Sequence, residues 1–147
     1  MSSRSGRGGW GSTGAMAEDG GGEAPLVQYV VVRADLYQRE GWTAGSLMAQ
    51  AAHAAVSIVW QTRGEQNTAD YCEQTEGDMR KVVMEVKDEA ALTKLADQLE
   101  GSGVAVSRWR EQPENEVTCV ATAPLRRTKD AMKLFRRARM CSALVAG

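Results

Sequence analysis

The sequence predicts a single α/β domain built on a mixed four-stranded β-sheet with helices packed against it. A length of 147 residues suits one domain, and 43% hydrophobic with 25% charged residues is typical of a globular protein. Strand-like and helix-like segments follow one another in the order β-α-β-α-β-β-α. The β-α-β crossovers imply parallel pairing, whereas the last two strands are joined directly and can pair antiparallel.

The chain is predicted to divide into three parts. Residues 1–25 are rich in glycine and serine and bury too little apolar surface to offset the entropy of ordering, so we expect a disordered tail. Residues 26–140 form the predicted domain, and residues 141–147 a flexible C-terminus. A cytoplasmic location is the main expectation. Arg4 and Arg7 leave a mitochondrial transit peptide as the alternative, although no amphipathic stripe supports it.

Four segments have the pattern of β-strands. Leu26–Arg33 is a nearly continuous β-branched run, which is typical of a central strand buried on both faces. The polar residues 34–42 that follow it are expected to form a loop. The other three strands are Lys81–Val86, Val104–Trp109 and Val117–Ala123.

Helices are expected between and after these strands. Asp88 lies where a helix N-cap belongs, and Ala91–Leu99 carries one apolar face that ends at Gly101. Residues 64–77 are polar and are expected to form a loop with one short helical turn. Pro124 begins a last, basic segment that is expected to be helical.

The most informative segment is an alanine-rich helix expected from Gly45 to Trp60. Its polar residues Ser46, Gln50, His53 and Ser57 are spaced by four, three and four positions and therefore share one face. The remaining residues are almost all Ala, Leu, Met and Val. Because they are small or apolar, we expect the helix to lie close to a sheet over nearly its whole circumference.

Two interpretations of this polar stripe remain open. In the first, Gln50 and His53 are structural, and nearby backbone groups satisfy their hydrogen bonds. In the second, the stripe lines a polar site beside the helix N-terminus, where the free amides of Gly45–Leu47 attract an anion or a developing oxyanion. His53 is the only histidine in the chain, so any imidazole chemistry must use it.

The cysteines and the apolar runs exclude several classes of protein. Cys72, Cys119 and Cys141 are scattered and odd in number, which argues against a disulfide framework and against a zinc site. Cys119 lies in an apolar strand and is expected to be a buried, inert thiol. The longest apolar stretches are too short to span a bilayer, so no membrane partner is expected.

Positive charge is concentrated near the C-terminus. Residues 26–123 contain 9 basic and 15 acidic residues, whereas residues 124–140 contain 7 basic residues and one acid. The basic side chains are candidates for RNA-backbone contacts, with Trp42 or Trp109 as a stacking surface, although a solvated helix face is the alternative. The candidates are Arg126, Arg127, Lys129, Lys133, Arg136 and Arg137, with Arg139 beside them.

A set of motifs resembles the type 2 peptidyl-tRNA hydrolase family. Val30–Leu36 has the form V-V-V-R-x-D-L, Gly45–Ala55 the form G-x-[IL]-x-A-Q-x-x-H-A-A, and Lys81–Val86 the form K-V-V-x-x-V. The segment E-Q-P-E-N at 111–115 is similar to the eukaryotic branch called peptidyl-tRNA hydrolase domain-containing protein. The resemblance covers about residues 27–137.

The resemblance implies a mixed four-stranded sheet and hydrolysis of the ester between a peptide and the 3′ ribose of tRNA, without a metal or other cofactor. His53, Gln50 and Ser46 would then be the catalytic candidates, tRNA the partner, and a homodimer one form of assembly. Active relatives place lysines at two positions that are Ala44 and Ser46 here. Losing an ammonium beside an oxyanion costs ~3–4 kcal/mol, by analogy with removing one oxyanion-hole donor.

The second departure lies before the last strand, where residues 110–115 replace the family's D-x-G-x-T segment. These departures leave a second hypothesis, a catalytically weakened or inactive homologue that binds tRNA or a protein. Glu111 and Glu114 are candidates for an acid/base pair, but Pro113 favours a surface turn there.

Overall fold

The computed structural model describes residues 23–73 and 78–143. Most of the predicted tail of residues 1–25, and residues 144–147 of the predicted C-terminus, lie outside the described residues. The elements in chain order are β1 (Leu26–Arg33), α1 (Ala34–Gln38), α2 (Ala44–Gln61), α3 (Gln66–Glu73), β2 (Lys81–Val86), α4 (Glu89–Gly101), β3 (Val106–Glu111), β4 (Glu116–Thr122), β5 (Leu125–Arg126), α5 (Lys129–Lys133) and β6 (Arg139–Met140).

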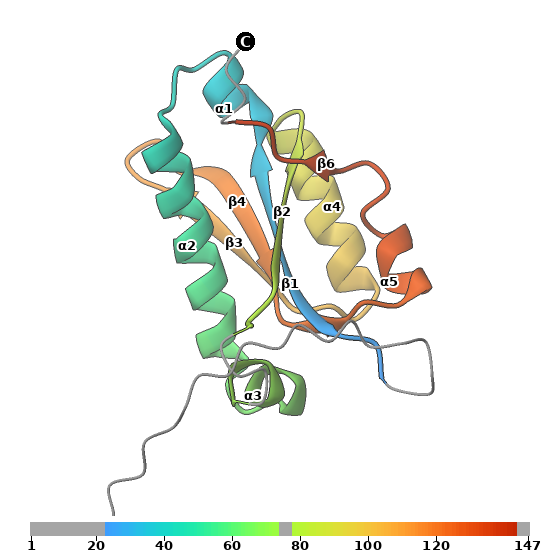
Figure 1. Ribbon diagram of the computed structural model, residues 1–147. Coiled ribbons are helices and arrows are strands. Elements are labelled where there is room, and N and C mark those ends of the chain that lie inside the picture. Colours follow the sequence, from blue (N-terminus) through green and yellow to red (C-terminus); the bar gives the residue numbers. More distant parts are fainter. Residues whose placement is uncertain (1–22, 74–77, 144–147) are drawn as a thin grey trace, which may run out of the picture.

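Within the described residues, six strands form one mixed sheet (Figure 1). The order is β3-β4-β1-β2-β6, and β5 pairs with the start of β1. β1 runs parallel to β2 and antiparallel to β4, which in turn pairs antiparallel with β3. The predicted α/β class and mixed pairing are therefore confirmed. The predicted count of four strands was too low, because β5 and β6 have two residues each and are too short to show a periodic pattern.

β1 is the central strand predicted from the sequence, and all eight of its residues are buried. Successive side chains point to opposite faces of the sheet, so Tyr29 and Val31 belong to one core and Val30 and Val32 to the other. The first core lies under α4 and the second under α2, and Figure 1 shows these helices on opposite sides of the sheet.

The predicted limits of α4 are also confirmed. The Asp88 carboxylate accepts a hydrogen bond from the Ala91 amide at 2.9 Å, which satisfies one of the donors at the helix start. Leu92 and Leu99 are fully buried against the sheet. The chain leaves the helix through Gly103, whose φ of 83° is a conformation that favours glycine.

Three segments differ from their predictions. Residues 34–42 contain the short helix α1, and residues 64–77 contain an eight-residue helix, α3, rather than a single turn. The basic C-terminal segment forms only the five-residue helix α5 and then continues as turns into β6. Just after α5, Phe135 is buried on the α4 side of the sheet, where its ring stacks on Tyr29 with centroids 4.5 Å apart.

The outer face of α2 is exposed, contrary to the expectation that nearly the whole circumference would be covered. Met48, Val56 and Trp60 are 56%, 68% and 66% exposed. The sheet covers only one side of the helix, and no other described element packs on the outer side. No described helix is long and apolar enough to cross a membrane.

Candidate active site

The start of α2 is shaped by a threonine cap. The Oγ1 atom of Thr43 accepts a hydrogen bond from the Ser46 amide at 3.2 Å and lies 3.0 Å from the Ser46 hydroxyl oxygen. Ser46 is exposed, but its amide is already satisfied, so it is not one of the free donors expected at this helix start. The hydroxyl of Ser46 is left as the group through which this residue can meet a ligand.

Gln50 is held in a fixed orientation one turn further along α2. Its side chain is 5% exposed, and its Oε1 atom accepts a hydrogen bond from the Thr118 hydroxyl of β4 at 2.8 Å. The Nε2 atom makes no hydrogen bond with any described residue, and it is not fully shielded from solvent. The amide of Gln50 is therefore a positioned donor that a ligand can reach.

A β-bulge brings Thr118 to this position. Trp109 pairs with Cys119 and Arg110 with Val117, so Thr118 is an extra residue in β4. A bulge interrupts the alternation of side chains and re-aims the residue within it. The Thr118 hydroxyl is thereby directed to α2.

His53 lies one turn after Gln50, on the surface. Its imidazole stacks on the indole of Trp109 in β3, with centroids 4.4 Å apart and planes 12° from parallel. No described residue is hydrogen-bonded to its ring nitrogens, and the residue is exposed. The ring is thus held by stacking, and the residue stays accessible to solvent. His53 also covers a face of Trp109, so that face is not free to stack on a base.

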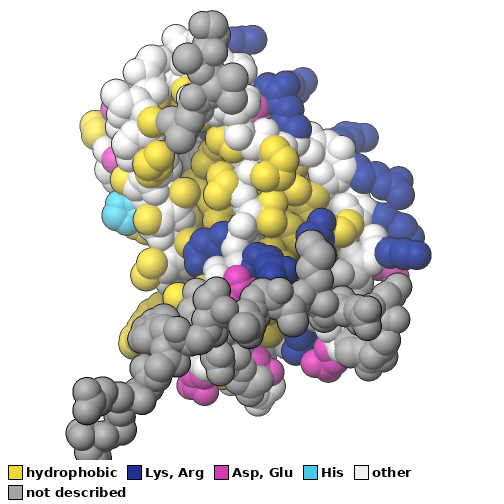
Figure 2. All heavy atoms as spheres, viewed as in Figure 1, with side chains coloured by type: hydrophobic (Ala, Val, Ile, Leu, Met, Phe, Trp, Pro, Cys, Tyr) yellow, Lys and Arg dark blue, Asp and Glu magenta, His cyan; other side chains and the backbone are white. Residues whose placement is uncertain are grey.

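The polar stripe and the apolar side of α2 face different elements. Gln50 and His53 contact the β3–β4 hairpin, whereas Leu47 and Ala51 line an apolar cavity of about 300 Å³ beside Val83 of β2. Figure 2 shows hydrophobic side chains gathered at the centre of this face of the molecule. The cavity can accept an apolar group close to the start of α2.

The turn between β3 and β4 contains the E-Q-P-E-N segment. The Gln112–Pro113 bond is cis, and the Arg110 guanidinium donates to the Asn115 carbonyl oxygen at 3.2 Å. Glu114 is exposed in this turn, which confirms the surface turn predicted from Pro113. Glu111 lies at the end of β3, opposite Glu116. The structure shows no contact that would join Glu111 and Glu114 into an acid/base pair.

No lysine or arginine of α2 is available to the site, because Ala44–Gln61 contains none. Arg33 lies on the neighbouring strand β1, but its side chain is only 5% exposed. Its guanidinium contacts four carboxylates, with N···O distances from 2.9 to 3.6 Å to Asp35, Glu40, Glu89 and Glu116. These neighbours hold the pKa of Arg33 above its ordinary value, the largest cause being the hydrogen bond with Asp35. Arg33 is therefore a structural cation.

The candidate RNA-binding residues lie apart from Gln50 and His53. α5 and the turn after it pack with α4, on the opposite face of the sheet from α2. Arg126 is partly buried and pairs with Glu23 at 2.9 Å, and Lys133 pairs with Asp130 at 2.9 Å. The four that have no ion pair among the described residues are Arg127, Lys129, Arg136 and Arg137, and all four are exposed.

No group of three or more His, Cys, Asp or Glu in the described part of the chain is arranged to hold a metal ion. Cys119 is fully buried, and burial raises the pKa of its thiol to about 12 despite a backbone hydrogen bond at Val31. The burial that the sequence predicted for this thiol is confirmed.

The mixed sheet, the helices on both of its faces and the Gln-x-x-His helix define an α/β domain of the peptidyl-tRNA hydrolase class. The chain belongs to this family, because its residues 26–135 match the family described as Peptidyl-tRNA hydrolase PTH2. It is 44% identical over 110 residues to the Homo sapiens protein named "Putative peptidyl-tRNA hydrolase PTRHD1". The matched region covers 74% of this chain and 78% of the human protein. The Mus musculus protein of the same name is 45% identical over 100 residues, covering 67% of this chain and 71% of the mouse protein.

Two contacts of this region could not be seen in the sequence. The bond from Thr118 to Gln50 depends on the bulge, and the stacking of His53 on Trp109 depends on the register between α2 and β3. A tryptophan in a strand and a histidine in a helix are each common features. Only the structure shows that the two rings stack on each other.

Proposed function

We propose that this protein hydrolyses the ester bond between a peptide and the 3′ ribose of tRNA. The observation that carries the proposal is the pair formed by Gln50, a buried side chain with an open amide donor, and His53, an exposed imidazole one turn away. Membership of the PTH2 family supports the choice of substrate.

The geometry suits general-base hydrolysis. A water molecule attacks the ester carbonyl carbon while His53 takes a proton from that water. The tetrahedral oxyanion accepts a hydrogen bond from Gln50 Nε2, since side-chain amides serve as oxyanion donors in other hydrolases. Collapse of the intermediate releases the 3′ oxygen of the ribose, which takes the proton back from His53. In this mechanism the Ser46 hydroxyl, at the start of the same stripe, binds a polar group of the substrate.

Two substitutions at His53 separate its chemistry from its packing. His53→Phe keeps an aromatic ring on Trp109 but removes both ring nitrogens, whereas His53→Ala removes the ring as well. If His53 is the base, both variants lose about 10²- to 10⁴-fold in the rate of release of peptide from peptidyl-tRNA. Val56→Ala, on the exposed face of the same helix, is the matched control and is expected to keep the wild-type rate. An unchanged rate in His53→Phe would exclude His53 as the base.

A second candidate function is supported by the absence of a free cation at α2. With no lysine in the helix and with Arg33 neutralised by carboxylates, a binding protein that retains the fold without efficient catalysis is the alternative. Single-turnover hydrolysis by excess wild-type protein distinguishes the two. A rate no higher than that of the protein-free reaction, together with tRNA binding, would establish the binding function instead.

Location and assembly belong to the same proposal. The three cysteines are unpaired, which accords with a reducing compartment such as the cytoplasm. A homodimer stays a prediction, and sedimentation of the full chain at micromolar concentration tests it.

A further inference from the structure

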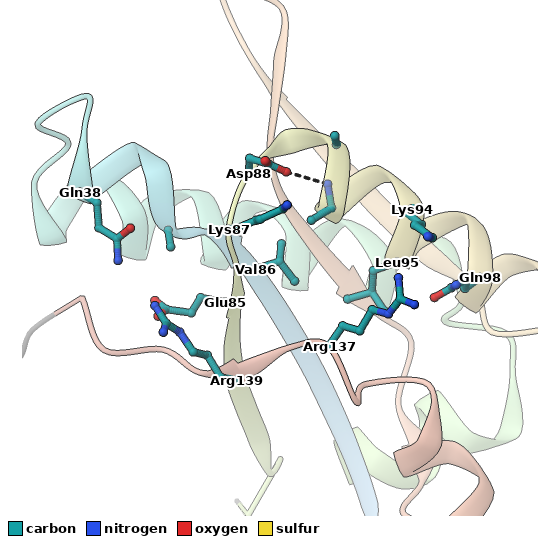
Figure 3. A pocket seen from close by; sticks show the side chains of 13 residues that line it. Gln38, Glu85, Val86, Lys87, Asp88, Lys94, Leu95, Gln98, Arg137 and Arg139 are labelled. Atoms are coloured by element: carbon teal, nitrogen blue, oxygen red, sulfur yellow. Dashed lines mark hydrogen bonds and ion pairs between the residues drawn. The ribbon is translucent and has the colours of Figure 1, made fainter.

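A second groove lies on the far side of the molecule from His53. It has a volume of about 640 Å³ and is bounded by the end of α1, the end of β2, the first turns of α4 and the chain leading into β6. Figure 3 shows its lining, with Val86 and Leu95 at its base and Lys87, Lys94 and Arg137 around it. We call it the α4 groove.

The charges of the α4 groove are not balanced within the protein. Lys87, Lys94 and Arg137 are exposed and have no ion pair or hydrogen bond among the described residues. Both acids that line the groove are already engaged. Glu85 is paired with Arg139 at 2.7 Å, and Asp88 caps the start of α4.

Amide side chains complete the lining. Gln98 lies one turn after Lys94 on the same face of α4, and Gln38 lies at the end of α1. An open groove with unpaired cations, neutral amide donors and an apolar base is suited to the phosphates and sugars of a nucleic-acid backbone.

We propose that the α4 groove, where Lys87 and Lys94 face Arg137, binds the phosphate backbone of RNA. This inference rests on the proposed function, which supplies tRNA as the substrate class, and it assigns two contacts from outside the basic C-terminal segment. The groove is continuous with that segment, since Arg137 lines it and the exposed Arg136 precedes Arg137 in the turn after α5. Figure 2 shows lysine and arginine side chains gathered along the side of the molecule where α4 and α5 lie.

The test is a salt titration of binding to a fluorescently labelled, deacylated tRNA, followed by anisotropy with the full chain. The groove variant is Lys87→Gln with Lys94→Gln. The matched control is Arg63→Gln with Arg80→Gln, which removes the same charge from exposed residues that do not line the groove. We expect the groove variant to bind about 10-fold more weakly at ~50 mM salt and its log–log salt slope to be smaller by about 1.4–1.8, the share of two phosphates. We expect the control to stay within about twofold of the wild type.

Each other outcome overturns the inference in a recognisable way. If both variants bind tRNA as tightly as the wild type, the α4 groove is not an RNA-binding site, and the proposed function is unaffected. Equal weakening by both variants would show an effect of net charge alone. A wild-type chain that binds no tRNA would refute the RNA contacts of the proposed function together with the groove. A preference for vesicles containing phosphatidylserine over tRNA, sensitive to Lys87→Gln with Lys94→Gln, would assign the groove to a membrane surface instead. Unchanged urea midpoints confirm that the variants are folded.

Discussion

Replacing Glu85 with glutamine tests how the C-terminal segment is held on the sheet. The side chain of Glu85 is fully buried in β2, and its two oxygens accept hydrogen bonds from three residues. The Tyr37 hydroxyl donates at 2.6 Å, Arg139 Nε at 2.7 Å, and the Ser142 hydroxyl and amide at 3.2 and 3.3 Å. Together with the bond from the Cys141 amide to the Val83 carbonyl at 3.1 Å, they fasten residues 139–142 across the edge of β2.

The size of the effect follows from these contacts. A hydrogen bond to a charged group contributes ~1.5–3 kcal/mol and a neutral one ~0.5–1.5 kcal/mol. Glu85→Gln removes the charge and turns an NH₂ group toward a donor, which weakens the bonds from Tyr37 and Ser142. Arg139 is 68% exposed, so its ion pair adds less than about 1 kcal/mol. We expect the free energy of unfolding at pH 7 to fall by about 2–3 kcal/mol.

The pH dependence of this loss of stability shows whether the negative charge of Glu85 is its cause. Burial works to raise the pKa of Glu85, but the hydrogen bonds from Tyr37, Ser142 and Arg139 outweigh it and hold the pKa below its ordinary value of 4.5. A carboxyl with a lowered pKa stabilises the folded state above its unfolded pKa, and this stability is lost as the pH falls through the folded pKa. The difference between wild type and Glu85→Gln should therefore narrow below about pH 4.5.

Urea unfolding from pH 7 down to about pH 3 measures this difference, and hydrogen exchange of the Cys141 amide reports on how firmly residues 139–142 are held on β2. Glu65→Gln is the control, because Glu65 is exposed and its side chain has no partner among the described residues. A difference from wild type that stays constant with pH, or unchanged protection of the Cys141 amide in Glu85→Gln, would refute the account given for Glu85.

Two further predictions concern the cores on either side of the sheet. Phe135→Ala removes the ring that stacks on Tyr29 and should lower the free energy of unfolding by ~3–5 kcal/mol, measured by urea unfolding; a loss below 1 kcal/mol would mean that the turn after α5 is not anchored there. Cys119, with a thiol pKa of about 12 and no exposed surface, should resist alkylation at pH 8 until the protein unfolds, whereas the exposed Cys72 reacts in the native state, as mass spectrometry of the labelled peptides will show.

The parts of the fold with strong local patterns were predictable from the sequence. The apolar run of β1 and the Asp88 cap of α4 each carry a local signal, and the structure confirms them. The short elements α1, β5 and β6 could not be found in this way. They have two to five residues, and pairing or packing with distant segments decides their conformation.

The candidate site was predictable in its residue types but not in its arrangement. The spacing of Ser46, Gln50 and His53 placed them on one helical face, but it did not show which strand each would meet. The bulge at Thr118 and the ring stacking on Trp109 depend on tertiary register, which the spacing of residues along a helix does not show. The position of the basic segment also depended on topology, since only the completed sheet shows that it lies on the α4 side.

The proposed active site and the α4 groove lie on opposite faces of the sheet, yet both open toward one end of it. β1 and β2 run parallel, and their carboxyl ends lead to α1 and α2 on one side and to α4 on the other (Figure 1). On the β4 side of this end, four carboxylates surround the single guanidinium of Arg33, an excess of three negative charges that repels a polyanion. On the β2 side lie Lys87 and, beside the start of α2, the apolar cavity. Of these two sides, the β2 side is therefore the more favourable approach for a polyanion such as RNA.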